Sequence, residues 1–343
     1  MGLVVSWYGA VCVGIVAVSF LGSLWVIWRK EGGSRLDDNA IFQSLLSGRP
    51  ETEGRYSVAK PRSHVDSSCL WASCWRGVHP GWLLATRLGS LAVMGGFLAW
   101  DIVEWDATIF VYYTEWTFTL VMVYFALGTV VSAYGCWVYS RQPSTGNGLT
   151  DQLLGRDLEE NRISAANNYG VKVVETRVSK LRSRYTEEEI LQRAGFWGYV
   201  MQIVYQTSAG AVILTDVVFW CIIVPFLSNA HLGLNLLMGC MHTLNAFFLL
   251  IDASLNSLPF PWFRLAYFVL WSSIYVIFQW VIHACGFSWW PYPFLEVSSP
   301  WSAVWYFAVA VIHVPCYGLC ALIMKSKNSI LSRLFPHSFT RSY

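Results

Sequence analysis

Four side chains in the apolar part of the sequence could together carry out nucleophilic catalysis. They are Thr114, Asp216, His242 and Asn245, and each lies within a long apolar run. A threonine hydroxyl becomes a nucleophile only when a base can take its proton, and histidine is the commonest such base. We interpret Thr114 as a candidate nucleophile, His242 as its base, and Asp216 or Asn245 as the group that orients the imidazole.

Acyl transfer at such a site would also need hydrogen-bond donors for a developing oxyanion. Gln279, Asn245 and Trp116 have suitable side chains, and the sequence does not choose among them. Asp252 does not qualify as the orienting group, because ten helical residues, or ~15 Å, separate it from His242 on one helix.

Each of these residues also has a purely structural interpretation. A threonine in a membrane helix usually bonds the carbonyl four residues before it, and a buried histidine often joins two helices. Asp216 is harder to explain structurally, since a carboxylate in hydrocarbon is costly. The aromatic segment at residues 289–293 is most simply an interfacial belt.

The elements that must position these residues are membrane helices. The chain has 343 residues, of which 55% are hydrophobic and 13% are charged, against roughly 25% charged in soluble domains. This composition excludes an ordinary soluble enzyme, and a net charge of +2 gives no basic surface for nucleic acid. We predict an all-α polytopic transmembrane helix bundle of about seven spans, at residues 3–28, 82–103, 109–138, 198–227, 232–251, 263–285 and 302–324.

These spans divide the chain into an added segment and a core. Residues 1–28 form an N-terminal transmembrane anchor, which is retained because it lacks a small-residue cleavage site and Arg29-Lys30 follow it. We predict a cytoplasmic loop at 29–81, a six-span membrane core at 82–325 that includes the loop 139–197, and a cytoplasmic tail at 326–343.

The distribution of lysine and arginine predicts the orientation. Residues 29–81 carry eight, residues 139–197 carry nine and the chain after residue 324 carries four, whereas the short connections carry none. The positive-inside rule places the N-terminus on the non-cytoplasmic side and the C-terminus in the cytoplasm, in the endoplasmic reticulum or the plasma membrane. The two long loops, charged and mixed in sign, are the expected surfaces for cytoplasmic protein partners.

Polar residues recur at helical spacing on four of the predicted spans. Such stripes must face protein or water, because ionisable and amide side chains are costly in hydrocarbon. The pattern therefore predicts one shared polar interior, made by Asn235, Gly239, His242, Asn245, Asp252 and Asn256; Gln202, Gln206 and Asp216; Ser272, Tyr275, Gln279 and His283; and Thr114 and Thr117.

Three short segments resemble a known family. Tyr112-Tyr113-Thr114, Met241-His242-Thr243 and Tyr292 to Glu296, in this order and at span-sized intervals, resemble the androgen-induced-protein family of six-span membrane proteins and its Rolling-stone-like relatives, over about residues 82–325. The resemblance implies hydrolysis of fatty acid esters of hydroxy fatty acids by an intramembrane threonine and histidine, here Thr114 and His242. The chain departs from the family in its first span, its long loops and Gly239-Cys240, where the family has an Asn-His pair.

The sequence therefore favours a threonine-dependent hydrolase whose lipid ester substrate enters from the surrounding membrane lipids, and we expect no cofactor and no metal. The alternatives are a non-catalytic protein that organises membrane contacts or partners, a transporter, and a bis-histidine haem protein that uses His242 and His313. The Rolling-stone-like relatives, which are associated with membrane and cell fusion, keep the non-catalytic alternative open.

Overall fold

The fold is a bundle of long helices. The computed structural model describes residues 7–46, 68–141, 195–227 and 236–341, and within these ranges it has no strand and seven helices long and apolar enough to span a membrane. The prediction of an all-α polytopic bundle is confirmed. The long helices are α1 (Trp7–Leu46), α3 (Gly81–Trp105), α4 (Tyr113–Arg141), α7 (Phe196–Val218), α8 (Leu236–Leu255), α9 (Leu265–Ala284) and α10 (Ser302–Leu334).

Helix α1 is longer than the sequence pattern predicts. It continues through Arg29-Lys30 to Leu46, although its apolar part ends at Glu31, because no proline stops it there. Most of the two predicted cytoplasmic loops, and Asn235 of the predicted stripe, lie outside the described residues.

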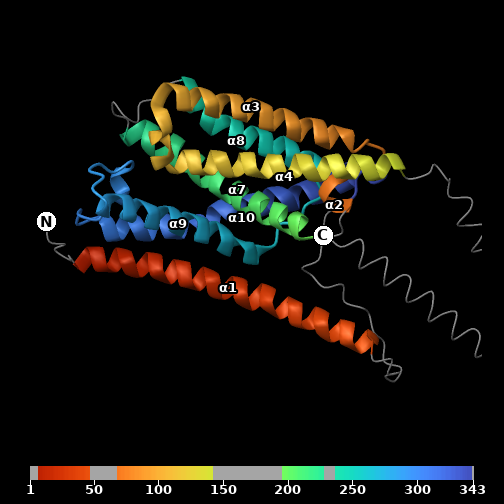
Figure 1. Ribbon diagram of the computed structural model, residues 1–343, viewed down its shortest axis with the longest axis horizontal. Coiled ribbons are helices and arrows are strands. Elements are labelled where there is room, and N and C mark those ends of the chain that lie inside the picture. The colour runs from red at the N-terminus through yellow and green to blue at the C-terminus, as the bar shows by residue number, and fades with distance from the viewer. Residues whose placement is uncertain (1–6, 47–67, 142–194, 228–235, 342–343) are drawn as a thin grey trace, which may run out of the picture.

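Helix α7 is the centre of the bundle. It packs against α4, α8, α9 and α10, while α3 packs against α4 and α8 on one side. Helix α1 packs against α9 and α10, so it flanks the other side (Figure 1). One face of α7 is lined by small and polar residues, including Gly210, where a side chain would meet the ring of Phe268 at 2.7 Å. Small residues of this kind let membrane helices approach closely.

The two ends of the bundle are built differently. At the η1 end, the 3-10 helix η1 (Asp106–Val111) joins α3 to α4, and the connection between α9 and α10 contains the 3-10 helix η4 (Pro293–Leu295). The α2 end contains α2 (Ser68–Trp71) and the chain that follows α10. In that part of the chain, the rings of Phe335 and Phe339 pack on the ring of Trp75. Figure 1 shows these groups at opposite ends of the molecule.

A buried ion pair joins α3 to α8 in the half of the bundle nearer the α2 end. Arg87 Nε lies 2.9 Å from Asp252 Oδ1, and the two side chains are 0% and 1% exposed. Arg87 also donates to the carbonyl of Leu70 and to Ser132 Oγ, and the hydroxyl of Tyr124 donates to Asp252. The polar stripe predicted that Asp252 faces protein. Arg87 was missed, although a lone arginine in the apolar run 82–103 is as costly in hydrocarbon as Asp216 and carried the same signal.

Helix α7 does not end at Val218 but widens into a π-helix, η2 (Phe219–Leu227), that contains Pro225. Proline has no N–H and disturbs the regular α-helical ladder. Local π-helical geometry is frequent at functional sites. Here it begins three residues after Asp216.

Candidate active site

The structure brings Thr114, His242 and Asp216 into one row. Thr114 Oγ1 lies 3.5 Å from His242 Nε2, and Asp216 Oδ1 lies 3.4 Å from His242 Nδ1 on the other side of the ring. The three side chains come from α4, α7 and α8. A hydroxyl, an imidazole and a carboxylate in this order form the arrangement of a nucleophile, a general base and an orienting group.

The imidazole of His242 is fixed by its surroundings. Its ring stacks on Phe219, with the centroids 3.7 Å apart and the planes at 10°, and its side chain is 3% exposed. Phe219 is the first residue of the π-helix, so the change from α to π geometry places its ring against His242. With Asp216 beside Nδ1, the tautomer protonated at Nδ1 leaves the Nε2 lone pair directed at Thr114.

The purely structural interpretation of Thr114 does not describe its bonding. Thr114 is the second residue of α4, and its hydroxyl contacts His242 and Tyr292 rather than a backbone carbonyl. By contrast, Thr129 and Thr215 bond the carbonyl four residues before them. The Thr114 hydroxyl therefore lies between two side chains of other elements, whereas the other two hydroxyls bond within their own helices.

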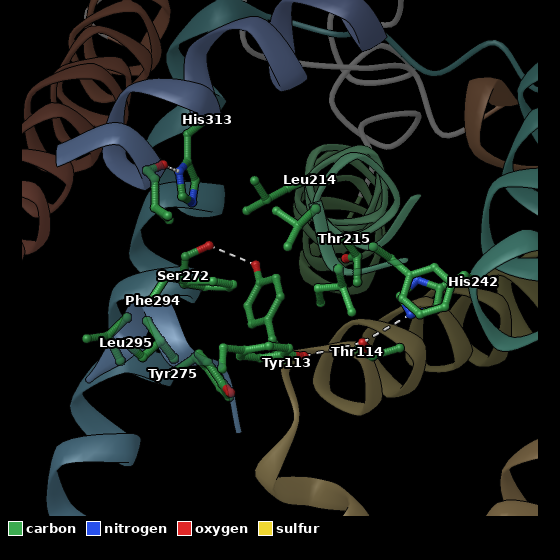
Figure 2. Close-up of a pocket in the computed structure, with 16 residues that line it drawn as sticks. Tyr113, Thr114, Leu214, Thr215, His242, Ser272, Tyr275, Phe294, Leu295 and His313 are labelled. Atoms are coloured by element: carbon green, nitrogen blue, oxygen red, sulfur yellow. Dashed lines mark hydrogen bonds between the residues drawn. The ribbon is translucent and has the colours of Figure 1, made fainter. Parts of the chain in front are cut away.

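A cavity opens next to this row. Its walls are mostly apolar, and its atom-free space, counted with the open space at its mouth, is about 540 Å³. Thr114 and His242 lie at one side of it, Ser272, Phe294 and Leu295 lie at the other, and the Tyr113 ring stands between them (Figure 2). The row of polar groups therefore faces a space that favours an apolar molecule.

Tyr292 belongs to the site and was missed by the sequence analysis. Its side chain is 6% exposed, and its hydroxyl lies 3.5 Å from Thr114 Oγ1. The aromatic-belt interpretation is therefore wrong for this residue. The connection before α10 folds back over the η1 end and is tied there by a hydrogen bond from the Tyr306 hydroxyl to the Leu295 carbonyl. Only the resemblance singled out the segment that contains Tyr292.

The Tyr292 hydroxyl can serve as a neutral donor. Burial raises its pKa, because the phenolate would lose its hydration, although a hydrogen bond with Thr114 acts in the opposite direction. The O–H therefore stays protonated at neutral pH. A donor this close to Thr114 can approach the oxygen of an ester carbonyl that Thr114 attacks.

The remaining supporting candidates lie elsewhere. Gln279 donates to the carbonyl of Val111, and Trp116 donates to the carbonyl of Phe110, so their N–H groups are engaged. Asn245 is buried one helical turn after His242 but does not line the cavity. The first N–H groups of α4, as of any helix, have no partner within the helix.

The polar stripe on α8 faces the protein as predicted. His242, Asn245, Asp252 and Asn256 are all buried, whereas Phe247 is 53% exposed. The stripe contributes to two separate regions, since His242 lies between Thr114 and Asp216 whereas Asp252 pairs with Arg87. His313 lines the same cavity as His242. Both ring nitrogens of His242 already face protein groups, Thr114 and Asp216, which leaves neither directed at a haem iron.

Comparison of the chain with protein-family models, curated proteins and solved structures finds no significant match. The fold and the site define a multi-pass membrane protein with a threonine, histidine and aspartate row beside an apolar cavity.

Proposed function

We propose that this chain is a membrane-embedded hydrolase that cleaves carboxylic esters of lipids. Thr114 is the nucleophile, His242 is the general base, Asp216 orients His242, and Tyr292 supports the reacting oxygen. The observation that carries the proposal is the row from Thr114 Oγ1 to His242 Nε2 and from His242 Nδ1 to Asp216, with separations of 3.5 Å and 3.4 Å.

The reaction has two halves. Thr114 Oγ1 attacks the ester carbonyl carbon while His242 Nε2 takes the hydroxyl proton, and the tetrahedral oxyanion is bound by the Tyr292 hydroxyl and the first N–H groups of α4. The C–O bond to the alcohol then breaks, and His242 returns the proton to the leaving oxygen. Water, activated by the same imidazole, attacks the threonine ester, releases the fatty acid and restores the Thr114 hydroxyl.

The separation of 3.5 Å between Thr114 and His242 is long for a hydrogen bond. Catalytic hydrogen bonds are often loose without substrate and tighten in the complex. Asp216 supports the same assignment, because a protonated imidazole beside a carboxylate is more stable than one alone in an apolar site.

The substrate class follows from the cavity. Its apolar walls favour a hydrocarbon chain, and Thr114 and His242 lie at one side of it. The resemblance to the androgen-induced-protein family supports fatty acid esters of hydroxy fatty acids or similar lipids. The lysine and arginine distribution supports a cytoplasmic C-terminus, which would put the η1 end and the catalytic row in the non-cytoplasmic half of the endoplasmic reticulum or plasma membrane.

The test uses full-length protein purified in detergent, a fluorophosphonate probe and a long-chain p-nitrophenyl ester. We expect the probe to label the wild type and not Thr114→Ala. Thr114→Ala and His242→Ala should each lower kcat/KM by about 100- to 10,000-fold, and the double variant should lose little more, because members of one catalytic unit are not additive.

The matched control is Thr117→Ala, a buried threonine one turn further along α4 that does not line the cavity. It should keep both labelling and turnover. Labelling that persists in Thr114→Ala would exclude Thr114 as the nucleophile. A folded wild type that neither labels nor cleaves any lipid ester would favour the non-catalytic function, in which the long loops bind cytoplasmic proteins.

A further inference from the structure

A second cavity adjoins the catalytic one and reaches α1. It lies between α1, α9 and α10, and its atom-free space, counted with the open space at its mouth, is about 480 Å³. The two cavities share six lining residues, Ser272, Val276, Phe294, Leu295, Val309 and His313. We call the second cavity the α1 compartment. The two cavities therefore lie side by side, and the Tyr113 hydroxyl, 2.7 Å from Ser272 Oγ, stands between Thr114 and the wall that they share.

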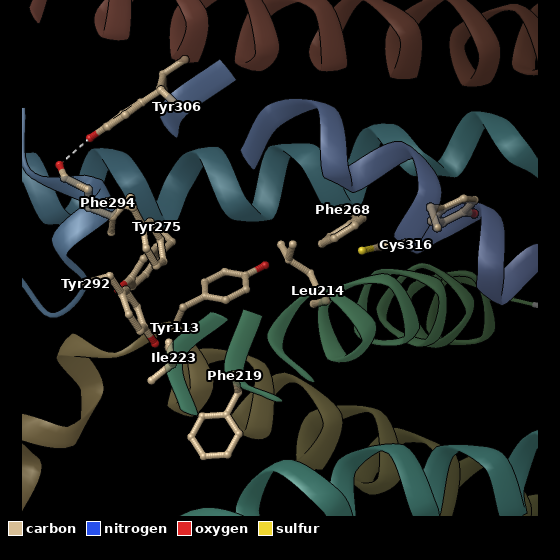
Figure 3. Packing of buried hydrophobic residues seen from close by; sticks show 14 of the residues in the cluster. Tyr113, Leu214, Phe219, Ile223, Phe268, Tyr275, Tyr292, Phe294, Tyr306 and Cys316 are labelled. Carbon is tan, nitrogen blue, oxygen red and sulfur yellow. Dashed lines mark hydrogen bonds between the residues drawn. The ribbon is translucent and has the colours of Figure 1, made fainter. Parts of the chain in front are cut away.

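The lipid-side wall of the α1 compartment is α1 itself. Ile15, Val16 and Ser19 of α1 line it, and Val16 is 7% exposed, whereas Val18 on the opposite face is 73% exposed. The helix is held there by packing along α9 and α10 and by a contact of 3.4 Å from Cys12 Sγ to Ser302 Oγ. Figure 3 shows α1 running past Tyr306 on the outer side of these helices.

The chemistry of the α1 compartment suits a hydrocarbon. Three of the polar side chains in its wall bond to protein groups: Ser273 donates to the Val269 carbonyl, Tyr306 to the Leu295 carbonyl, and Ser272 to the Phe268 carbonyl. The buried His313 Nε2 has no hydrogen-bond partner among the described residues, and it lies in the shared wall. A polar substituent on a bound chain could therefore form a hydrogen bond with His313 Nε2, while the rest of the chain would make apolar contacts.

We propose that the α1 compartment binds the distal part of the substrate's acyl chain while the ester lies at Thr114. The proposal rests on the proposed function, and it assigns a purpose to the added first span: α1 closes the chain-binding chamber against the bilayer. A chain that fills both cavities buries more apolar surface than one that fills the catalytic cavity alone. The chamber therefore selects long-chain esters over short ones.

The test compares p-nitrophenyl palmitate with p-nitrophenyl butyrate on full-length purified protein. Val16→Trp and Ala310→Phe fill the α1 compartment from two different helices. Each should lower kcat/KM for the palmitate ester about tenfold or more, in the range that steric discrimination in an apolar pocket gives, and leave the butyrate ester unchanged. Val18→Trp, on the lipid-facing side of α1, should change neither.

A second measurement does not depend on activity. Palmitic acid with a diazirine at its terminal carbon should photolabel α1, α9 or α10 of the wild type, and Ala310→Phe should abolish this labelling. If the wild type cleaves neither ester but is labelled in this way, the proposed function fails and the chain-binding chamber stands.

If the wild type cleaves both esters and both filling variants keep its palmitate-to-butyrate ratio, the chamber assignment is wrong and the hydrolase stands. Labelling of other helices only would also overturn the assignment. A wild type that cleaves butyrate but not palmitate would do the same.

Discussion

Breaking the Arg87–Asp252 pair should destabilise the bundle strongly, and the loss should depend on which of the two side chains is removed. Both charges are buried, at 0% and 1% exposure, and removing one partner of such a pair typically costs about 3–5 kcal/mol, because the other charge is left uncompensated. Arg87→Met leaves Asp252 with the Tyr124 hydroxyl and the Asn256 amide as donors, 2.7 Å away in the latter case. The loss should therefore lie near ~3 kcal/mol.

Asp252→Leu should cost more than Arg87→Met. It leaves a guanidinium whose remaining partners are all neutral oxygens, those of Leu70, Gly128, Ser132 and Tyr124. An arginine cannot shed its charge, whereas a carboxylate can take up a proton. We expect a loss near ~5 kcal/mol for Asp252→Leu and a smaller loss for the double variant than the sum of the two single losses.

The assay is unfolding of the purified protein in mixed micelles by SDS titration, followed by circular dichroism. Arg333→Met, which removes an exposed arginine from α10, is the control and should stay within about 0.5 kcal/mol of the wild type. If the double variant lost as much stability as the two single variants together, the two charges would not be coupled. If Asp252→Leu kept the stability of the wild type, the pair would not be a buried one. Either result would refute the reasoning.

Three further results are expected. Tyr292→Phe should lower kcat about 100-fold with little change in KM, since a lost oxyanion donor acts on the transition state; an unchanged kcat would remove Tyr292 from the mechanism. Asn245→Leu should lower the unfolding free energy or the activity while Phe247→Leu is tolerated, because the first side chain is 1% and the second 53% exposed; equal sensitivity in stability and activity assays would mean that α8 is turned differently. Once the native cysteines, including the exposed Cys285, are replaced, impermeant thiol reagents on the non-cytoplasmic side of sealed membranes should label Ser288→Cys in the connection before α10 and spare Thr150→Cys, as the lysine and arginine distribution predicts; the reverse pattern would invert the orientation.

The catalytic row shows where sequence reasoning reached the site and where it stopped. Helical spacing identified the face of α8 that carries His242, and the cost of a carboxylate in hydrocarbon singled out Asp216. The same reasoning could not choose between Asp216 and Asn245 as the group beside His242. That choice depends on how α7 and α8 are rotated against each other, which no periodicity within one helix records. Gln279 shows the same limit of the sequence pattern. Its spacing predicted a polar face directed at the site, but its side-chain N–H donates to the carbonyl of Val111.

The sequence by itself determined that this is an all-α membrane protein of seven apolar helices, because twenty-residue apolar runs have one stable state in a bilayer. It also determined which face of α8 is polar. The tertiary structure alone decided that Arg87 pairs with Asp252, that Tyr292 turns inward onto Thr114, and that α1 walls a chamber next to the catalytic row. These are contacts between residues far apart in the chain. They arise from helix packing and loop folding, which depend on the shapes of several elements at once rather than on the pattern within any one of them.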